Sequence, residues 1–384
     1  MLLASIYVAA VPFAIWIYLL LGRGAFWRLS EDATVPKPLE NWPRVVAVVP
    51  ARNEAATISQ TISSLAKQDY PGEFSIIVVD DHSEDGTASL AQQAANESGA
   101  SQRVTIHPAA PLSPGWTGKL WALNEGMQVA ASQSAEFFWF TDADIEHAPD
   151  TLRRLMFRAE KESLDLASLM VLLQAKTFPE RLLIPPFLYF FLMFYPPRWI
   201  ADPNASTAGA AGGCILLRRN VLAPVRGIAS IRGEVIDDCA LARAVKKNGG
   251  RIWMGLTRTS VSLRSYGTFA EIRDLVARTA FTQLHYSFVF LLIALAGLFA
   301  TFLIPWFSFL AGDDPAWFLA STAICLMAVT FGVTVRFYGL PWPWALTLPI
   351  AAVFYGYATL LSAVRYWLGR GGQWKGRAQA RRLD

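Results

Sequence analysis

Apolar residues occur in two distinct patterns along this chain. Four long stretches contain no charged residue, whereas the part from about 40 to 285 mixes short apolar runs with polar segments. About 20 apolar residues are enough to cross the hydrocarbon core of a bilayer. The pattern therefore predicts transmembrane helices at both ends of the chain and a soluble α/β domain between them. The uncharged stretches are residues 1–22, 286–312, 315–335 and 337–364.

The central part alternates between short apolar runs and amphipathic segments. A β-branched run at 45–49 reads as a buried strand, and the spacing of Ile58, Ile62 and Leu65 after it predicts a helix. Strand–helix alternation of this kind predicts a mostly parallel sheet with flanking helices. No G-x-G-x-x-G follows the first strand, which disfavours a dinucleotide-binding dehydrogenase. Further strands are expected at 76–79, 104–106 and 137–140, and further helices at 87–95 and 119–131.

Charged side chains follow three of the predicted strands. Arg52 and Glu54 come after the first, Asp81 after the second, and Asp142 and Asp144 after the fourth. Ligands bind at the carboxyl edge of open α/β sheets, and a D-x-D pair there can hold a divalent cation that in turn holds a diphosphate. Each residue alone is explained equally well as a helix cap or a turn former. Their recurrence at three strand ends favours a binding site.

Cysteine and charge usage indicate a reducing compartment and a membrane surface. The chain has 384 residues, three scattered cysteines and a net charge of +4. Three cysteines without C-x-x-C spacing form neither a disulfide framework nor a zinc site. Arg23 and Arg28 follow the first apolar stretch, so the positive-inside rule places the soluble domain in the cytoplasm.

The basic tail at 365–384 is expected to contact anionic lipid headgroups. Nucleic-acid binding is disfavoured because no basic surface interleaved with aromatic residues accompanies the tail. Three C-terminal crossings that start from the cytoplasm would leave this tail outside, against the charge rule. The proline-rich stretch 341–344 makes the last apolar segment a candidate for a bent or re-entrant element. The sequence leaves this conflict open.

The motifs and their order resemble the inverting family 2 glycosyltransferases with a GT-A fold. The likeness extends over about residues 44–255. A closer likeness, to the hopene-associated glycosyltransferases of bacterial hopanoid biosynthesis, includes the apolar segments at both ends. The family motifs lie at 49–54, 79–87, 142–144, 212–214 and 237–238, and the closer likeness rests on 115–121, 182–185, 236–241 and 278–283.

The resemblance implies roles for the residues after the first two strands. Pro50 and Arg52 would flank the nucleotide of a UDP-sugar. Glu54 would either contact the nucleotide or cap the following helix, with the cap slightly favoured. Asp81 matches the carboxylate that accepts a hydrogen bond from the uracil N–H, because an ionised carboxylate is purely an acceptor.

The resemblance also implies a diphosphate and metal site. Lys119, at the start of a helix, would reach the diphosphate as a point charge. Asp142 would approach the ribose or the metal, and Asp144 would ligate Mg²⁺ or Mn²⁺. The glycines at 212–213 would allow close approach of the backbone to substrate, or else form a simple turn. His147 is expected to stand at the start of a helix rather than to be a ligand.

Asp238 is the predicted catalytic base. Displacement at the anomeric carbon needs a proton taken from the acceptor hydroxyl, and a single displacement inverts the configuration. Asp237 and Asp238 open a predicted helix, so an alternative is that both merely favour its positive N-terminus. That environment would lower the pKa of a base, whereas repulsion from Asp237 would raise it.

One family feature is missing. The Q-x-x-R-W motif with which many membrane members end the catalytic part does not occur. Arg278, Gln283 and His285 are candidates to serve the acceptor or diphosphate in its place. Its absence favours transfer of one sugar over processive synthesis. The aromatic segment 181–200 is predicted to lie on the membrane surface beside the site, with a buried core helix as the alternative.

These expectations define a multi-pass enzyme of the bacterial cytoplasmic membrane. It would move one sugar from a UDP-sugar to a lipid hydroxyl, with a hopanoid-like acceptor and no nucleic-acid partner. The alternatives are a polyprenyl-phosphate glycosyltransferase and a non-catalytic nucleotide-binding membrane scaffold. The expected parts are an anchor at 1–22, a cytoplasmic domain at 40–285, membrane segments at 286–364 and the tail at 365–384.

Overall fold

The computed structural model describes residues 2–29, 31–311, 314–374 and 377–378. The chain divides into two compact units. The predicted cytoplasmic domain, 40–285, differs from the second unit because 175–198 and 266–285 group with the apolar helices instead. The first unit comprises Met1–Leu29, Ala175–Arg198 and Tyr266–Gly372, and the second Ser30–Gln174, Trp199–Ser265 and Gln373–Asp384.

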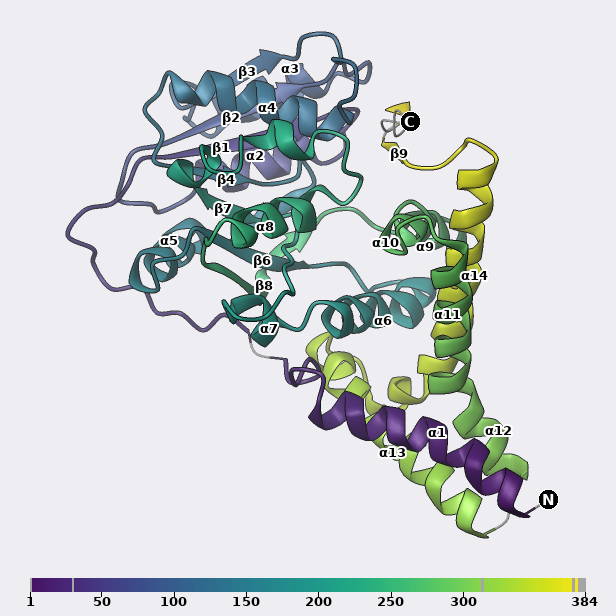
Figure 1. Cartoon of the computed structure of the whole chain (residues 1–384). Coiled ribbons are helices and arrows are strands. Elements are labelled where there is room, and N and C mark those ends of the chain that lie inside the picture. The colour runs from purple at the N-terminus through teal and green to yellow at the C-terminus, as the bar shows by residue number, and fades with distance from the viewer. Residues whose placement is uncertain (1, 30, 312–313, 375–376, 379–384) are drawn as a thin grey trace. The chain divides into compact units, whose positions relative to one another are not determined.

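The second unit is built on a mixed sheet with the strand order β3-β2-β1-β4-β7-β6-β8-β5 (Figure 1). Neighbouring strands from β3 to β4 run parallel, as do β6 and β8. β7 runs antiparallel to both of its neighbours, and β5 runs antiparallel to β8. The strands are β1 (Val45–Ala51), β2 (Phe74–Asp80), β3 (Val104–Pro108), β4 (Phe137–Phe140), β5 (Ile145–His147), β6 (Leu166–Leu172), β7 (Ile215–Arg218) and β8 (Ile252–Ser262).

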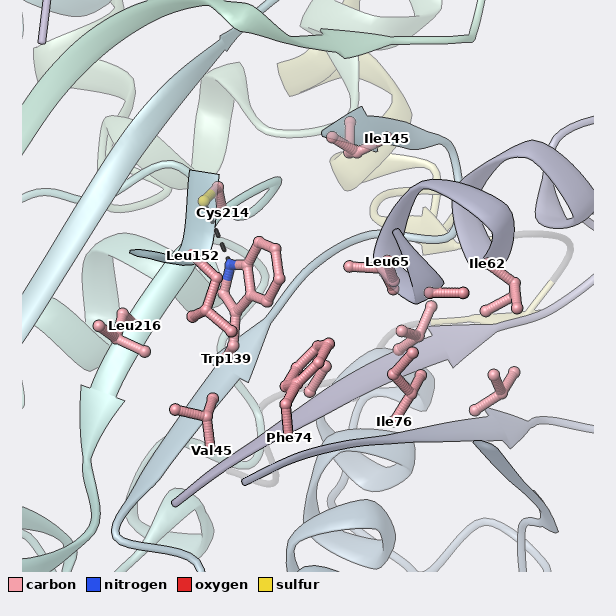
Figure 2. Packing of buried hydrophobic residues seen from close by; sticks show 14 of the residues in the cluster. Val45, Ile62, Leu65, Phe74, Ile76, Trp139, Ile145, Leu152, Cys214 and Leu216 are labelled. Atoms are coloured by element: carbon pink, nitrogen blue, oxygen red, sulfur yellow. Dashed lines mark hydrogen bonds between the residues drawn. The ribbon is translucent and has the colours of Figure 1, made fainter. Parts of the chain in front are cut away.

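Three helices cover one face of this sheet. Ile58, Ile62 and Leu65, at the predicted spacing, form the buried face of α2. They belong to one hydrophobic core with the alternate residues of β1 and with Trp139 of β4, whose Nε1–H lies 3.3 Å from the Cys214 sulfur (Figure 2). The helices of this face are α2 (Ile58–Ala66), α3 (Thr87–Glu97) and α5 (Thr151–Lys161).

Helix α4 (Gly118–Ala131) packs on the opposite face. A Cβ atom on Gly126 would lie 2.4 Å from Val48 Cγ1 and 2.9 Å from Val79 Cγ2. Glycine there lets the helix approach β1 and β2 closely, and this places the start of α4 near the carboxyl ends of those strands. The remaining helices of the second unit are α8 (Asp237–Lys247) and the short 3₁₀ turns η1 (Arg219–Leu222) and η2 (Ile228–Ile231), and α7 (Pro197–Ala201) spans the unit boundary.

We expect Gly126→Ala to destabilise the second unit by about 1–3 kcal/mol, because the added methyl overpacks the helix–sheet contact. An ordinary glycine-to-alanine change inside a helix instead stabilises by roughly 0.5–1 kcal/mol. Thermal unfolding of the detergent-purified protein checks the sign. The matched control is Gly297→Ala in a C-terminal helix, where no described atom lies within 4 Å of the new Cβ. A higher melting temperature for Gly126→Ala would contradict the close packing.

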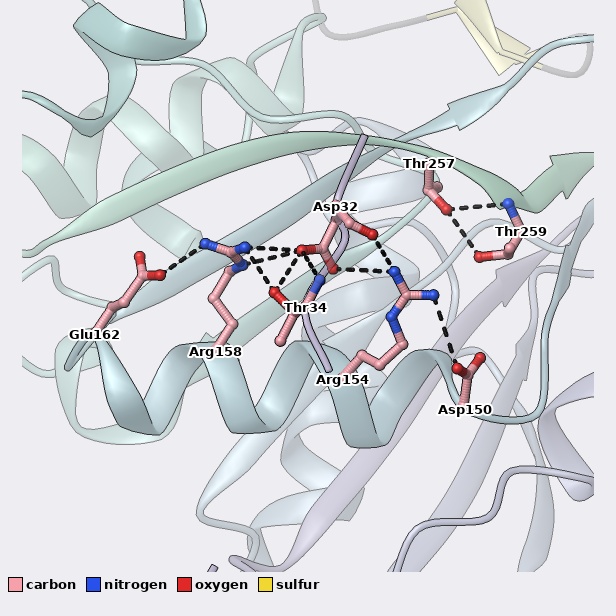
Figure 3. Close-up of polar contacts among 8 residues, drawn as sticks. All are labelled: Asp32, Thr34, Asp150, Arg154, Arg158, Glu162, Thr257 and Thr259. Carbon is pink, nitrogen blue, oxygen red and sulfur yellow. Dashed lines mark hydrogen bonds and ion pairs between the residues drawn. The ribbon is translucent and has the colours of Figure 1, made fainter. Parts of the chain in front are cut away.

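The segment that follows the first apolar helix is anchored on α5. Asp32 is buried, and its Oδ1 lies 2.8 Å from Arg158 Nη2 (Figure 3). The same carboxylate pairs with Arg154 and accepts from the Thr34 hydroxyl at 2.6 Å. A buried carboxylate needs such partners to remain ionised. The sequence pattern gave no sign of this anchor.

The first unit consists of helices. Among the described residues, three helical segments are long and apolar enough to cross a membrane: Phe288–Ala311, Asp314–Phe337 and Trp342–Trp367. The segment Trp342–Trp367 begins with a 3₁₀ turn and continues as an α-helix, and its 26 residues are long enough for a membrane span. The elements are α1 (Leu2–Leu21), α6 (Phe178–Phe194), α9 (Phe269–Ala277), α10 (Ala280–Gln283), α11 (Phe288–Leu298), the π-helical turn η3 (Phe299–Leu303), α12 (Ile304–Ala311), α13 (Asp314–Phe337), η4 (Trp342–Thr347) and α14 (Leu348–Trp367).

The predicted membrane-surface segment 181–200 folds mainly as α6. Most of its apolar side chains are buried within the first unit, and Tyr189 bonds the Thr330 hydroxyl of α13 at 2.8 Å. The Tyr355 hydroxyl of α14 donates to the Leu183 carbonyl at 2.8 Å. This burial fits the alternative, a buried helix, and the place of 181–200 at the membrane surface stays a prediction. The prolines 185–186 do not end the helix, which continues to Phe194.

Candidate active site

The charged residues predicted at strand ends share one edge of the sheet. β2, β1 and β4 are neighbours and run parallel. Their carboxyl ends therefore bring Asp81, Arg52 and Asp142 to the same side, as the sequence predicted. β1 continues through Pro50 to Ala51, so this proline lies within a buried strand instead of ending it.

The loops after β1 and β2 are held together by hydrogen bonds between side chains and backbone. The N–H groups of residues 53, 54 and 55 donate to Ser83 Oγ, Thr87 Oγ1 and Asp85 Oδ2 at 3.0, 2.8 and 3.0 Å. Side chains of the 79–87 motif therefore fix the backbone of the loop after β1, which carries the end of the 49–54 motif. Thr57 is the N-cap residue of α2. The role of Glu54 stays a prediction.

Asp81 lies beneath these loops. Its side chain is fully buried, with Oδ1 3.3 Å from His82 Nδ1 and Oδ2 4.0 Å from Arg52 Nη1. The Arg52 guanidinium also donates to the carbonyls of Asp81 and His82. In this structure Arg52 therefore orients Asp81. Recognition of uracil by Asp81 stays a prediction.

The loop that carries the D-x-D pair is anchored through its middle residue. The Ala143 carbonyl accepts from Thr57 Oγ1 at 3.1 Å and from Thr61 Oγ1 at 3.0 Å, both from the α2 segment. Asp142 remains partly exposed and lies 2.9 Å from Lys119 Nζ. Asp144 Oδ2 lies 3.5 Å from Arg264 Nε. Each carboxylate thus faces a cation.

Asp144 is held close to other carboxylates. Burial raises its pKa to about 6, with repulsion from Asp142 adding to the effect, while Arg264 opposes it. Arg264 Nη2 also lies 3.5 Å from Glu54 Oε2. Arg264 follows β8 and was missed by the sequence reasoning. A basic residue directly after a long strand is the only signal that the sequence offers for it.

The D-x-D pair has the donor chemistry of a magnesium or manganese site. Within the described ranges, no cluster of three or more Asp, Glu, His or Cys side chains is arranged to hold a metal ion. Mg²⁺ nevertheless commonly uses one or two carboxylates together with water and substrate phosphates. Burial and repulsion from Asp142 together raise the pKa of Asp144, and a bound cation would offset both effects. Asp142 and Asp144 therefore fit a metal that arrives with a diphosphate.

Asp238 is placed at the start of α8. Its Oδ2 accepts from the Gly212 N–H at 2.9 Å, and its Oδ1 accepts from the Cys239 N–H at 2.7 Å. Burial raises the pKa of Asp238 to about 6, and repulsion from Asp237 adds to the effect. The two backbone hydrogen bonds and Lys119 act in the opposite direction. A carboxylate tuned in this way is a usable base near neutral pH.

Lys119 links the two groups of carboxylates. Besides Asp142, its Nζ approaches Asp237 Oδ2 at 3.3 Å. Burial alone would lower the pKa of Lys119, but these carboxylates outweigh burial and raise it. Gly212 lies between them, since a Cβ there would be 3.0 Å from Lys119 Nζ and 3.4 Å from Asp238 Oδ2. A side chain at 212 would enter the site, which explains the glycine.

A small cavity opens beside these charges. Its walls include Pro50, Lys119, Asp142, Asp237 and Asp238. Most of the remaining lining is apolar. The apolar residues are Leu120, Leu123, Phe140, Ile215, Ile228, Ile231 and Leu241. The cavity thus has charged side chains at one end and an apolar wall.

The candidates for the missing motif belong to the first unit. Arg278 is the C-cap residue of α9, and Gln283 ends α10. Gln283 exchanges hydrogen bonds with the Tyr195 hydroxyl at 2.7 and 2.9 Å. His285 has a positive φ of 52°. Their service to an acceptor or diphosphate stays a prediction.

The structure also corrects the prediction that His147 stands at the start of a helix. It is the last residue of β5, rather than the start of a helix. Its ring lies in the protein interior, 4.7 Å from the Trp139 ring. Burial lowers its pKa to about 3, so the imidazole is neutral. No local pattern in the sequence signals this, because the partners Ser64 and Ser260 are distant in the chain.

Comparison with known proteins agrees with this geometry. Residues 46–225 match the family model described as glycosyl transferase family 2. The chain is 34% identical over 130 residues to beta-monoglucosyldiacylglycerol synthase of Synechocystis sp., covering 33% of this chain and 24% of that protein. It is 31% identical over 131 residues to an N-acetylglucosaminyltransferase of Rhizobium leguminosarum bv. viciae, covering 33% and 28%. The chain thus spans about a quarter of the length of the curated relatives it matches.

A solved structure shares the fold over nearly the whole chain. Mannosyltransferase PcManGT from Pyrobaculum calidifontis, in complex with GDP-Man and Mn²⁺, has a TM-score of 0.60 at 20% identity. The alignment covers 95% of this chain and 99% of that one. The identity is low, so this is a likeness of fold. Residues 46–225 thus match a family 2 glycosyltransferase model, and the solved structure shows that the GT-A-like fold is shared.

Proposed function

We propose that this protein is a membrane-bound inverting glycosyltransferase that moves a single sugar from a UDP-sugar to a lipid hydroxyl. The arrangement of Lys119 carries this proposal. Its ammonium group lies 2.9 Å from Asp142 and 3.3 Å from Asp237, next to Asp238. One cation thus joins the carboxylates suited to a metal–diphosphate group to those suited to deprotonating an acceptor.

The reaction is a single displacement. The acceptor hydroxyl gives its proton to Asp238 while its oxygen bonds to the anomeric carbon. The bond from that carbon to the diphosphate oxygen breaks at the same time, so the configuration inverts. Lys119 stabilises negative charge on the departing diphosphate. A divalent cation held by Asp142 and Asp144 would supply further charge neutralisation there.

Two observations support a lipid acceptor. The wall beside Asp238 is apolar, with Ile228, Ile231 and Leu241 among its residues. The first unit also offers three helical segments with the length and composition of membrane spans. One relative is named a synthase of a glucosylated diacylglycerol. The choice of a hopanoid-like acceptor rests on the motif resemblance alone.

Two alternatives are separable by experiment. A polyprenyl-phosphate acceptor needs little deprotonation, so Asp238 would then be largely dispensable. A nucleotide-binding scaffold would bind UDP with metal and transfer nothing. Burial raises the pKa of Asp238 to about 6, and a carboxyl suited to act as a base favours a hydroxyl acceptor over both alternatives.

We expect the detergent-purified full chain to release UDP from one UDP-sugar only when Mg²⁺ or Mn²⁺ and a hopanoid-containing lipid extract are both present. The sugar should appear in the lipid phase. GDP-sugars belong in the same panel, because the solved mannosyltransferase was complexed with GDP-Man. Turnover of GDP-sugars alone would contradict the donor, and UDP release that is independent of lipid would contradict the acceptor. Binding of UDP and metal without turnover would favour the scaffold.

A further inference from the structure

A chain of buried polar groups runs through the second unit beside the site. Ser260 of β8 lies 2.9 Å from His147 Nδ1, and His147 Nε2 lies 2.8 Å from Thr141 Oγ1. Thr141 Oγ1 then donates to the Gly213 carbonyl at 3.0 Å. All three side chains are buried to 3% exposure or less. The four residues come from three parts of the sequence, around 141–147, 213 and 260.

The bond from Thr141 to the Gly213 carbonyl sets the direction of the other hydrogen bonds among these buried groups. Thr141 Oγ1 has one hydrogen and two carbonyl acceptors, Gly213 at 3.0 Å and Asp142 at 3.4 Å, and we assign the hydrogen to the nearer one. Thr141 Oγ1 must then accept from His147, which places the ring hydrogen on Nε2. A neutral imidazole has only one N–H, so Nδ1 accepts from the Ser260 hydroxyl. In this arrangement each of the three side chains has a hydrogen-bond partner.

The two ends of the path from His147 are adjacent to the reacting groups. Thr141 directly precedes Asp142, which pairs with Lys119. Gly213 directly follows Gly212, whose N–H donates to Asp238. The bond between Thr141 and Gly213 therefore ties the D-x-D loop to the loop that holds the base. Neither residue needs to touch substrate for this to matter.

The surroundings hold both loops stiffly. Ser168 of β6 accepts from the Ala211 N–H at 2.9 Å and donates to the Cys214 carbonyl at 3.0 Å. Trp139 packs against the His147 ring and donates from Nε1 to Cys214. Thr141 and Trp139 thus both bond from the end of β4 to this loop, and the bond from His147 restricts rotation of the Thr141 hydroxyl.

We propose that His147 is a positioning residue: as the Nε2–H tautomer it orients the Thr141 hydroxyl toward Gly213 and so sets the separation between the Asp142 carboxylate and the Asp238 base. This inference rests on the proposed function for the identity of the base. Displacing a catalytic group by about 1 Å can cost about a hundredfold in rate. The loss should therefore appear in kcat, since the groups that bind the nucleotide are unchanged.

The kinetic test compares two substitutions at one position. His147→Phe keeps a ring against Trp139 but removes the hydrogen bond, and we expect kcat to fall about tenfold to a hundredfold. His147→Gln offers an amide N–H at the reach of Nε2, so it should recover most of that loss. The KM for the UDP-sugar should stay within about threefold of the wild-type value in both. Equal losses of kcat in both variants, or a loss confined to KM, would overturn the positioning role.

A second measurement needs no turnover. Nitrogen-15 NMR of the histidine-labelled full chain in detergent reports the tautomer of each of its four histidines. The His147 signals are those absent from His147→Gln. We expect an Nε2–H tautomer that does not gain a proton down to about pH 5. An Nδ1–H tautomer would overturn the inference even in an active enzyme. If the wild type shows no turnover but has the expected tautomer, the proposed function is wrong, and so is the catalytic positioning role of His147.

Discussion

Asp238→Asn is expected to lower kcat by about 10²–10⁴-fold while the protein still binds UDP and metal. Asparagine keeps the shape, and its single amide oxygen can keep one of the two hydrogen bonds, from Gly212 or from Cys239. It cannot take a proton from the acceptor hydroxyl, so the chemical step is lost selectively. Rapid-quench turnover of lipid and UDP-sugar measures kcat, and titration calorimetry measures binding. A rate within about tenfold of the wild type would favour a phosphate acceptor.

The same residue sets a pH dependence. Burial and Asp237 raise the pKa of Asp238 to about 6, and the base acts only when deprotonated. The value of kcat/KM should therefore rise with pH to a plateau, with its midpoint near pH 6. Asp237→Asn removes the like charge, so the midpoint should move to lower pH. A profile that is flat between about pH 5 and 7 would contradict the assignment of Asp238.

Asp144→Asn is expected to lower kcat/KM by about a thousandfold and to weaken the response to Mn²⁺ or Mg²⁺. A metal at a departing diphosphate contributes several kcal/mol to the rate, and each 1.4 kcal/mol corresponds to about tenfold. The substitution removes one of the two carboxylates that face the expected ion. The measurement is turnover as a function of metal concentration, together with calorimetry of UDP binding with and without Mn²⁺.

A matched control separates this effect from a general loss of charge. Asp69 pairs with Arg153 at 3.0 Å, and both side chains are partly exposed, at 40% and 37%. Asp69→Asn should leave turnover and metal response within about twofold of the wild type, because exposed ion pairs contribute little. If Asp144→Asn shows the same metal response as Asp69→Asn, the metal assignment at Asp144 is wrong.

Local patterns were sufficient for the elements and for the edge of the sheet that carries the site. The apolar runs of β1, β2 and β4 and the spacing in α2 were visible in the sequence and are confirmed. The carboxylates after these strands converge because parallel neighbouring strands end at the same edge. That inference needs only strand order and direction, which repeat between related folds.

Other features depend on contacts between distant residues. Arg264 meets Glu54 across 210 positions, and His147 meets Ser260 across 113. The antiparallel pairing of β7 and β5 brings such residues together. Periodicity along the sequence does not predict these contacts. The same reason applies to α6, whose composition suits either a membrane surface or a protein interior.

The sequence by itself determined which residues end the strands, and hence which carboxylates could meet a nucleotide sugar. Only the tertiary structure decided how those carboxylates behave. The pKa of Asp238 reflects burial together with Asp237, Lys119 and the Gly212 N–H, all brought together by folding. Electrostatic interactions depend on the distance between charges and on the exclusion of water. The spacing of residues along the sequence determines neither of these quantities.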